Sequence, residues 1–220
     1  MRISADFGEP ILFRTTNADV YDATLKHGSL WLRSDAYYRN IEDQSRVDTS
    51  EGVNSSRPTI PMSFKIENGP SIQIFGPGAI GQKIVPHYIV SLHGSSISAE
   101  QIRAFGGHTF GIKNLSKLSA EVLYRASSLI RCNGYRYGSV SYQRTSLCLS
   151  RSTIGSAAIQ LCENPPLYLN PLDTDVLRKD PVSPFIEQDE WRIAIFANGY
   201  LDGDANFPLQ IKVDPSHFYA

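Results

Sequence analysis

The amino-acid sequence predicts an α+β fold in one domain that spans residues 1–220. Segments with a strand pattern outnumber helical segments, about eight against about three, and the helices fall early and in the middle of the chain. An alternating parallel fold would instead place a helix between successive strands. The chain also contains no repeat, no low-complexity tract and no composition change typical of a linker, so we expect a single domain.

The first predicted elements are a strand, a helix and a second strand. An apolar strand at 11–15 leads to Asn17, whose side chain is a good helix N-cap, and the helix ends at Gly28, where glycine favours a C-terminal cap. The second strand, 29–34, follows directly. Residues 39–57 are then polar and too many for a plain turn, which is typical of a functional loop.

The middle of the chain is predicted to contain two strands and a short helix. Residues 71–75 alternate apolar and polar side chains, and 87–92 form a more continuously apolar strand. The glycine-rich loop 76–81 between them lacks the Gly-Lys-Ser/Thr of a phosphate-binding loop. Ser98 begins a capping box, which predicts a helix at 99–105.

The longest predicted helix follows a strand at 108–113 and ends near Gly134. Apolar residues recur along this helix at spacings of three and four, which places them on one face. These residues are Leu115, Leu118, Val122, Leu123, Ala126, Leu129 and Ile130. The remaining predicted strands are 139–143, 146–149, 191–197 and 209–213, with a proline-rich connection at 164–184.

The composition argues against several classes of partner. The net charge is −1, from 21 Lys and Arg against 22 Asp and Glu, so no long-range field attracts the chain to nucleic acid. An Arg- and Tyr-rich stretch at 124–151 would suit base stacking, although such residues are more often solvated strand edges. No apolar run has the length of a signal peptide or a membrane helix, so we expect a cytoplasmic protein without a membrane partner.

Three cysteines, Cys132, Cys148 and Cys162, are spaced more widely than the ligands of a zinc site, and their odd number does not fit a disulfide framework. We expect buried free thiols.

The segment before the strand at 191–197 carries three carboxylates, Glu187, Asp189 and Glu190. Mutual repulsion among crowded carboxylates can raise the pKa of one of them, which would suit a group that manages charge in a transition state. Glu190 is expected at the mouth of the strand, where reactive groups often gather. A solvated turn is the alternative.

Three other features are candidates for chemistry. Arg14 lies in an apolar strand, and its guanidinium suits phosphate or carboxylate recognition, unless it is an outward-facing edge residue. Ser91 lies in a buried strand without a G-x-S-x-G elbow, so we expect a positioning hydroxyl or a core serine. Asp43, Asp48 and Glu51 lack the ligand spacing of an EF-hand, so we expect a polar loop over a cleft and no metal site.

In chain order, these segments resemble the Arg, Ser, Glu pattern of the cholera-toxin-like branch of the mono-ADP-ribosyltransferases. The matching elements are Phe13-Arg14, Tyr88-Ile-Val-Ser91 and Gln188-Asp-Glu190-Trp-Arg192. The chain also resembles a group of uncharacterised bacterial and phage proteins that share these elements. That group adds a Gly28–Ser34 strand, an Asp43–Gly52 loop and a Phe105-Gly106 segment.

The resemblance implies split, mostly antiparallel β-sheets with about three helices, and an enzyme that cleaves the nicotinamide–ribose bond of NAD. This reaction passes through an oxocarbenium-like cation, and ADP-ribose is transferred to a protein or other acceptor, as by a toxin, effector or phage factor. Glu190 would stabilise the cation and bind a ribose hydroxyl, and Gln188 would orient the acceptor. Arg14 would bind the phosphates of NAD, and Ser91 would hold the Arg and Glu sides of the pocket.

Tyr38 or Tyr88 would stack on the nicotinamide ring. The sequence departs from the family at Ser91, where Val-Ser-Leu stands in place of Ser-Thr-Ser, so Thr145 or Ser146 is a second candidate for the hydroxyl. Because an inactive relative would keep the fold, the alternative function is a non-enzymatic module that binds a nucleotide-like ligand or a protein. A metal-dependent nuclease that uses the acidic loop is a third hypothesis.

Overall fold

The computed structural model describes residues 3–40, 86–140, 142, 177, 179 and 185–220, together with four short strands between 53 and 83. The chain divides into two compact units. The first unit comprises Met1–Gly52, Val85–Tyr142 and Val176–Ala220, and the second comprises Val53–Ile84 and Gln143–Asp175. A single domain for residues 1–220 stays a prediction.

The four short strands of the second unit form two antiparallel pairs. Strand β3 (Val53–Ser56) pairs with β6 (Ile80–Lys83), and β4 (Met62–Lys65) pairs with β5 (Ser71–Ile74). The strand predicted at 71–75 is therefore confirmed, whereas the end of the loop predicted at 76–81 belongs to β6.

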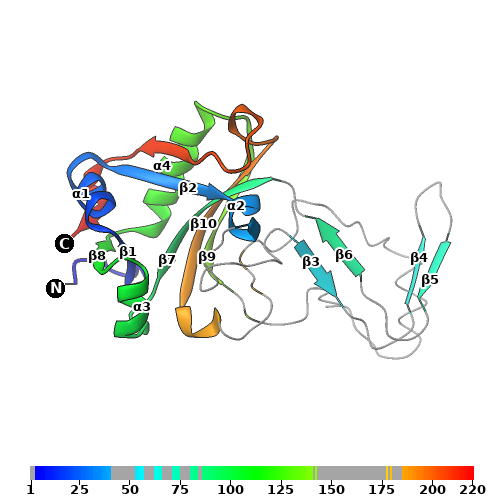
Figure 1. Cartoon of the computed structure of the whole chain (residues 1–220), viewed down its shortest axis with the longest axis horizontal. Coiled ribbons are helices and arrows are strands. Elements are labelled where there is room, and N and C mark those ends of the chain that lie inside the picture. The colour runs from blue at the N-terminus through cyan, green and yellow to red at the C-terminus, as the bar shows by residue number, and fades with distance from the viewer. Residues whose placement is uncertain are drawn as a thin grey trace. The chain divides into compact units, whose positions relative to one another are not determined.

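The first unit is a mixed α+β structure, and all the strand pairs described in it are antiparallel (Figure 1). Its helices are α1 (Ala18–His27), α2 (Asp35–Asn40), α3 (Ala99–Ala104) and α4 (Leu115–Ser127). Its strands are β1 (Leu12–Thr16), β2 (Ser29–Ser34), β7 (His87–His93), β8 (His108–Ile112), β9 (Cys132–Ser139), β10 (Glu190–Ala197), β11 (Leu209–Lys212) and β12 (Phe218–Tyr219). The sheet order is β11-β2-β7-β1-β8-β12, and β10 pairs with both β7 and β9. The predicted α+β class is therefore confirmed.

Helix α2 adds a fourth helix to the three that the sequence predicts. Its start is capped by Ser34, whose hydroxyl accepts a hydrogen bond from the backbone N–H of Tyr37 at 2.9 Å and donates one to the carbonyl of Ala205. With six residues, α2 is too short for an apolar stripe to reveal it.

Helix α1 begins and ends at the predicted residues. The side chain of Asn17 accepts a hydrogen bond from the backbone N–H of Val20 at 3.0 Å. Gly28 has φ 65° and ψ 20°, the left-handed conformation of a C-terminal cap. Its carbonyl also accepts a hydrogen bond from the backbone N–H of Val213 at 3.0 Å. The turn therefore joins α1 to the chain that follows β11.

We expect Gly28→Ala to lower the free energy of unfolding by roughly 2–4 kcal/mol, because two costs add. Alanine is strained at a positive φ, and its Cβ would overlap the carbonyl of Val213. Denaturant unfolding measures the loss. Gly8→Ala is the control, since Gly8 has φ 83° but no atom within 4 Å of an added Cβ. Equal losses in the two variants would contradict the close contact.

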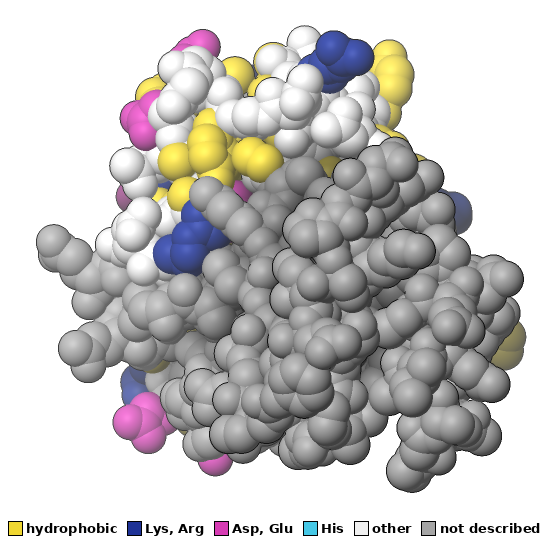
Figure 2. Space-filling model, turned by 90° about the vertical axis from the view of Figure 1, so that its right-hand side faces the viewer, with side chains coloured by type: hydrophobic (Ala, Val, Ile, Leu, Met, Phe, Trp, Pro, Cys, Tyr) yellow, Lys and Arg dark blue, Asp and Glu magenta, His cyan; other side chains and the backbone are white. Residues whose placement is uncertain are grey.

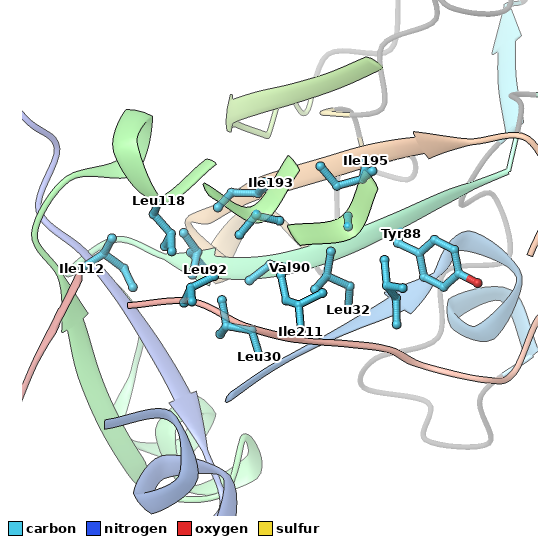
Figure 3. Close-up of a cluster of buried hydrophobic side chains, with 14 of the residues drawn as sticks. Leu30, Leu32, Tyr88, Val90, Leu92, Ile112, Leu118, Ile193, Ile195 and Ile211 are labelled. Atoms are coloured by element: carbon cyan, nitrogen blue, oxygen red, sulfur yellow. The ribbon is translucent and has the colours of Figure 1, made fainter. Parts of the chain in front are cut away.

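The core lies on one face of β7 and β10. Side chains alternate along a strand, so Val90 and Leu92 of β7 share a face with Ile193 and Ile195 of β10. Helix α4 covers this face (Figure 1), and its predicted apolar stripe contributes Leu115, Leu118, Val122 and Ala126 to the core. Figure 3 shows Leu30 and Leu32 of β2 and Ile211 of β11 in the same cluster.

Two neighbours share one edge of β7. Strand β10 pairs with β7 along its whole length, whereas β2 pairs at Tyr88 and Ile89 and β1 pairs at His93. Between these positions, no described strand pairs with Ser91 on this edge. The sheet therefore forks, with β1 and β2 diverging on either side of Ser91.

Strand β9 lies earlier than the strand predicted at 139–143. It includes Gly134 and Gly138 and few buried side chains, and among the described strands it pairs with β10 alone, so its sequence lacks the alternation of a half-buried strand. The strand predicted at 146–149 lies outside the described residues. Cys132, at the start of β9, is a half-buried free thiol whose pKa is raised by burial, and Cys148 and Cys162 lie outside the described residues.

On the face drawn in Figure 2, the described part of the surface carries both acidic and basic side chains, which lie among apolar ones. This distribution agrees with the near-zero net charge of the sequence. No helix among the described residues is long and apolar enough to cross a membrane.

Candidate functional site

A cavity of about 560 Å³ opens at the fork between β1 and β2. This volume is within the range of small-molecule sites. Its walls come from β1 and the following N-cap, β2, α2, the end of β7, the turn after α3 and the start of β10. Five of the six predicted site residues line it, namely Arg14, Tyr38, Ser91, Gln188 and Glu190.

Four polar side chains share the face of β7 and β10 that lies opposite the core. The register pairs Ser91 with Arg192 and His93 with Glu190, and all four residues line the cavity. The alternation that sends Ile193 and Ile195 into the core thus turns Glu190 and Arg192 toward the cavity. The predicted place of Glu190 at the mouth of the strand is confirmed, since Glu190 is the first residue of β10.

The carboxylate of Glu190 is held at both oxygens. Its Oε1 accepts hydrogen bonds from Ser91 Oγ at 2.9 Å and from Arg192 Nε at 2.8 Å. Its Oε2 lies 2.8 Å from Lys179 Nζ, which also donates to Gln188 Oε1 at 3.1 Å. The backbone N–H of Glu190 donates to the hydroxyl of Tyr142 at 3.1 Å. One carboxylate therefore orders a serine and two cations.

Burial and charge act in opposite directions on Glu190. Burial raises the pKa of its carboxyl group, but the charges and hydrogen bonds of Arg192 and Lys179 outweigh burial and lower the pKa to about 2. The three side chains are between 2 and 7% exposed. Glu190 is therefore ionised at neutral pH although it is buried.

Arg14 connects the two sides of the fork. Its Nη2 donates a hydrogen bond to the carbonyl of Trp31 at 3.3 Å, from β1 to β2. Arg14 is also one of the residues that line the cavity. The alternative, that Arg14 faces outward from an edge strand, is therefore corrected, since β1 pairs with both β7 and β8.

Aromatic residues and an arginine from β2 and α2 form one wall of the cavity. The guanidinium of Arg33 lies 4.4 Å from the ring centroid of Tyr37 and 5.6 Å from that of Trp31. The rings of Tyr37 and Tyr38 meet edge to face with centroids 5.5 Å apart. The wall combines flat apolar surface with positive charge, which suits a planar, anionic ligand.

Asp35 anchors this wall to the rest of the unit. Its buried carboxylate accepts hydrogen bonds from the backbone N–H of His87 at 3.2 Å, from the Tyr200 hydroxyl at 3.0 Å and from Arg39 Nη1 at 2.7 Å. Burial, with the charge of Asp35, raises the pKa of Tyr200 to about 12, so the hydroxyl stays a donor. Helix α2 is therefore fixed at its first turn.

A chain of hydroxyl groups ends on His93. Thr15 Oγ1 lies 2.9 Å from His93 Nε2 and 2.8 Å from Thr109 Oγ1, and His93 Nδ1 lies 2.7 Å from the carbonyl oxygen of Gly94. Burial lowers the pKa of His93, and the hydrogen bond to Gly94 and the charge of Asp189 oppose this effect. Both Thr15 and His93 line the cavity.

Tyr88 does not line the cavity, so the expected role of Tyr88 in stacking on nicotinamide is corrected. It is fully buried in the core with Val90 and Ile195 (Figure 3), and its hydroxyl accepts a hydrogen bond from the backbone N–H of Leu201 at 2.8 Å. Because side chains alternate along β7, Tyr88 and Ser91 lie on opposite faces.

The other two carboxylates of the acidic segment lie outside the cavity lining. Glu187 is exposed, and Asp189 adopts φ 43° with its carboxylate against Gly94. Thr145 and Ser146, the second candidates for the hydroxyl, lie outside the described residues, as do Asp43, Asp48 and Glu51 of the acidic loop.

Three titratable side chains beside Glu190 in the cavity lining were not among the predicted site residues. Arg192 is a charged residue inside an otherwise apolar strand, and this feature of the sequence could have marked it as a site residue. His93 flanks Ser91, but no sequence pattern joins it to Thr15. Lys179 lies in a proline-rich stretch with no periodic pattern, so only the tertiary structure brings it to Glu190.

The described lining carries an excess of positive charge. It contains the cations Arg14, Arg33, Lys179 and Arg192 and the carboxylate of Glu190. Such a cavity favours an anionic ligand, with phosphate as a good match for the guanidinium groups.

Comparisons of this chain with protein-family models, curated proteins and solved structures found no match.

Proposed function

We propose that the cavity binds NAD as a substrate and that Glu190 promotes cleavage of its nicotinamide–ribose bond, with transfer of ADP-ribose to a protein or other acceptor. The observation that carries the proposal is the convergence of Arg14, Ser91 and Glu190 in one cavity, with Ser91 Oγ 2.9 Å from the Glu190 carboxylate. These are the three residues by which the chain resembles the mono-ADP-ribosyltransferases. The forked antiparallel sheet supports the same fold.

The electrostatics of Glu190 suit the reaction. Cleavage builds positive charge on the ribose, and a fixed carboxylate stabilises that charge more in the transition state than in the ground state. A pKa of about 2 keeps the carboxylate ionised, and Ser91 and Arg192 hold it in place. Lys179, which contacts the Glu190 carboxylate, also donates a hydrogen bond to the side chain of Gln188. Gln188 would orient the acceptor.

The rest of the cavity suits the other parts of NAD. The guanidinium of Arg14 would bind the phosphates, because arginine matches phosphate with paired hydrogen bonds. Tyr38 would offer its ring to the nicotinamide. The wall formed by Trp31, Arg33 and Tyr37 adds positive charge and flat surface.

A specific contact supports the second candidate function, a non-enzymatic module that binds a nucleotide-like ligand. The ammonium group of Lys179 lies 2.8 Å from Glu190 Oε2 and neutralises part of the carboxylate. A carboxylate that keeps this partner when ligand binds would contribute little to catalysis. Binding of NAD without release of nicotinamide would identify this function.

The test is incubation with NAD labelled in the nicotinamide ring, with and without a mixture of candidate protein acceptors. We expect release of nicotinamide, and we expect Arg14→Gln to raise the KM for NAD by roughly 10- to 100-fold with a smaller change in kcat, because a charged hydrogen bond to phosphate is lost. Calorimetry measures the same loss as weaker binding.

Arg103→Gln is the matched control, since it removes one positive charge from an exposed residue of α3 outside the cavity lining. Equal KM values for the Arg14 variant and the wild-type protein would contradict the proposed phosphate contact.

A further inference from the structure

The hydrogen-bond partners of His93 determine which nitrogen of its ring carries the proton. The carbonyl oxygen of Gly94 can only accept, so the proton of the ring lies on Nδ1. The lone pair of Nε2 then accepts the hydrogen of the Thr15 hydroxyl, and Thr15 in turn accepts from Thr109. A hydroxyl oxygen accepts two hydrogen bonds, so Thr15 retains one acceptor position.

Transfer of ADP-ribose requires a group that accepts the proton of the attacking molecule. Gln188 has an amide, which is not a base, and Glu190 has a pKa of about 2, which makes it a weak one. The arginines and Lys179 are cations. Among the described residues that line the cavity, His93 is therefore the side chain with a neutral, basic nitrogen at pH 7.

We propose that Thr15 and His93 form a proton relay in the transfer of ADP-ribose, and that the acceptor is a hydroxyl group, either of water or of an alcohol. This inference rests on the function proposed above. The acceptor O–H donates to Thr15 while Thr15 donates to His93 Nε2. The acceptor oxygen forms a bond to the ribose carbon, and the nicotinamide nitrogen leaves with the electron pair of the broken bond. The acceptor proton passes to Thr15, whose own proton passes to His93. The positive charge of the nicotinamide ring thus ends on the imidazole.

The charge of the cavity supports this class of acceptor. Guanidinium and ammonium groups are cations at pH 7, and the four cations of the lining repel them. Neutral hydroxyl groups meet no such repulsion, and they have the O–H donor that the free acceptor position of Thr15 requires.

A relay that needs neutral His93 has a defined pH dependence. Burial lowers the pKa of His93 below its ordinary value of 6.5, whereas Gly94 and the charge of Asp189 oppose burial. Glu190 faces His93 across the strand pair and stays ionised over this range. Activity is therefore expected to fall as the pH decreases through the lowered pKa of His93, which lies below 6.5.

The experiment measures nicotinamide release and product identity with NAD in water, in dilute methanol and with agmatine, a guanidinium compound. We expect hydrolysis in water, a methyl ADP-ribose product with methanol and no agmatine product. His93→Gln and Thr15→Val should each lower kcat by roughly 10²-fold, with the dissociation constant for NAD within about twofold of the wild-type value. Thr15→Ser, which keeps the hydroxyl, should retain activity within about threefold. His108→Gln is the control, because His108 is an exposed histidine of β8, and it should match the wild-type protein.

The outcomes separate this inference from the function on which it rests. Absence of nicotinamide release by the wild-type protein overturns both. Release by the wild-type protein, with wild-type kcat in folded His93→Gln and Thr15→Val, overturns the relay alone. An agmatine product without a methanol product overturns the hydroxyl acceptor. Loss of activity in Thr15→Val with recovery in Thr15→Ser supports the relay even if His93→Gln fails to fold.

Discussion

We expect Glu190→Gln to lower the rate of nicotinamide release from NAD by roughly 10²- to 10³-fold, the usual effect of removing one electrostatic stabiliser of a transition state. Glutamine has the shape of glutamate, and its carbonyl oxygen can still accept the hydrogen bond from Ser91. It lacks the charge that would stabilise the cationic ribose. The loss should therefore appear in kcat rather than in the KM for NAD.

Two further variants give this result its meaning. Glu187→Gln is the matched control, because Glu187 is exposed and lies outside the cavity lining. Ser91→Ala keeps both ion pairs of Glu190 and removes one hydrogen bond, so we expect a loss of roughly tenfold. A folded Glu190→Gln protein that releases nicotinamide at the wild-type rate would contradict the catalytic role of Glu190.

We expect Arg192→Met to lower the free energy of unfolding by roughly 3–5 kcal/mol, because it leaves a buried carboxylate without its closest guanidinium. Arg192 is 2% exposed and donates to Glu190 Oε1 at 2.8 Å. Urea unfolding at pH 7 measures the loss. Lys26→Met is the control, since Lys26 and Asp22 form an ion pair of the same length with side chains 63% and 59% exposed. Such a surface pair contributes under about 1 kcal/mol.

The pH dependence of stability checks the same cluster. The pKa of Glu190 is lowered from 4.5 to about 2 in the folded protein, so its contribution is present above pH 4.5 and is lost as the pH falls toward 2. The contribution is on the order of 3 kcal/mol. Removal of Arg192 raises the folded pKa, so the variant should lose less stability over this range. Parallel curves for the two proteins would show that Arg192 does not control the ionisation of Glu190.

The sequence by itself determined the elements whose cause is local. The cap at Asn17, the end of α1 at Gly28 and the apolar stripe of α4 depend on residues a few positions apart, which is the range over which backbone geometry repeats. The alternation in β10 likewise placed Glu190 at the mouth of the strand. Local patterns do not report strand pairing, which is why β9, paired with β10 alone among the described strands, was missed. Helix α2 was missed because six residues are too few for an apolar stripe.

Only the tertiary structure decided which of these residues meet. Ser91 and Glu190 are 99 positions apart, and Thr15 and His93 are 78 positions apart, so no periodic pattern relates them. The forked edge of β7 separates β1 from β2 at the cavity, and β10, on the other edge of β7, contributes Glu190 and Arg192 to its lining. Lys179 and Arg192 then set the charge of Glu190. The reason is physical: alternation assigns a side chain to a face, whereas strand register and sheet topology select its neighbours.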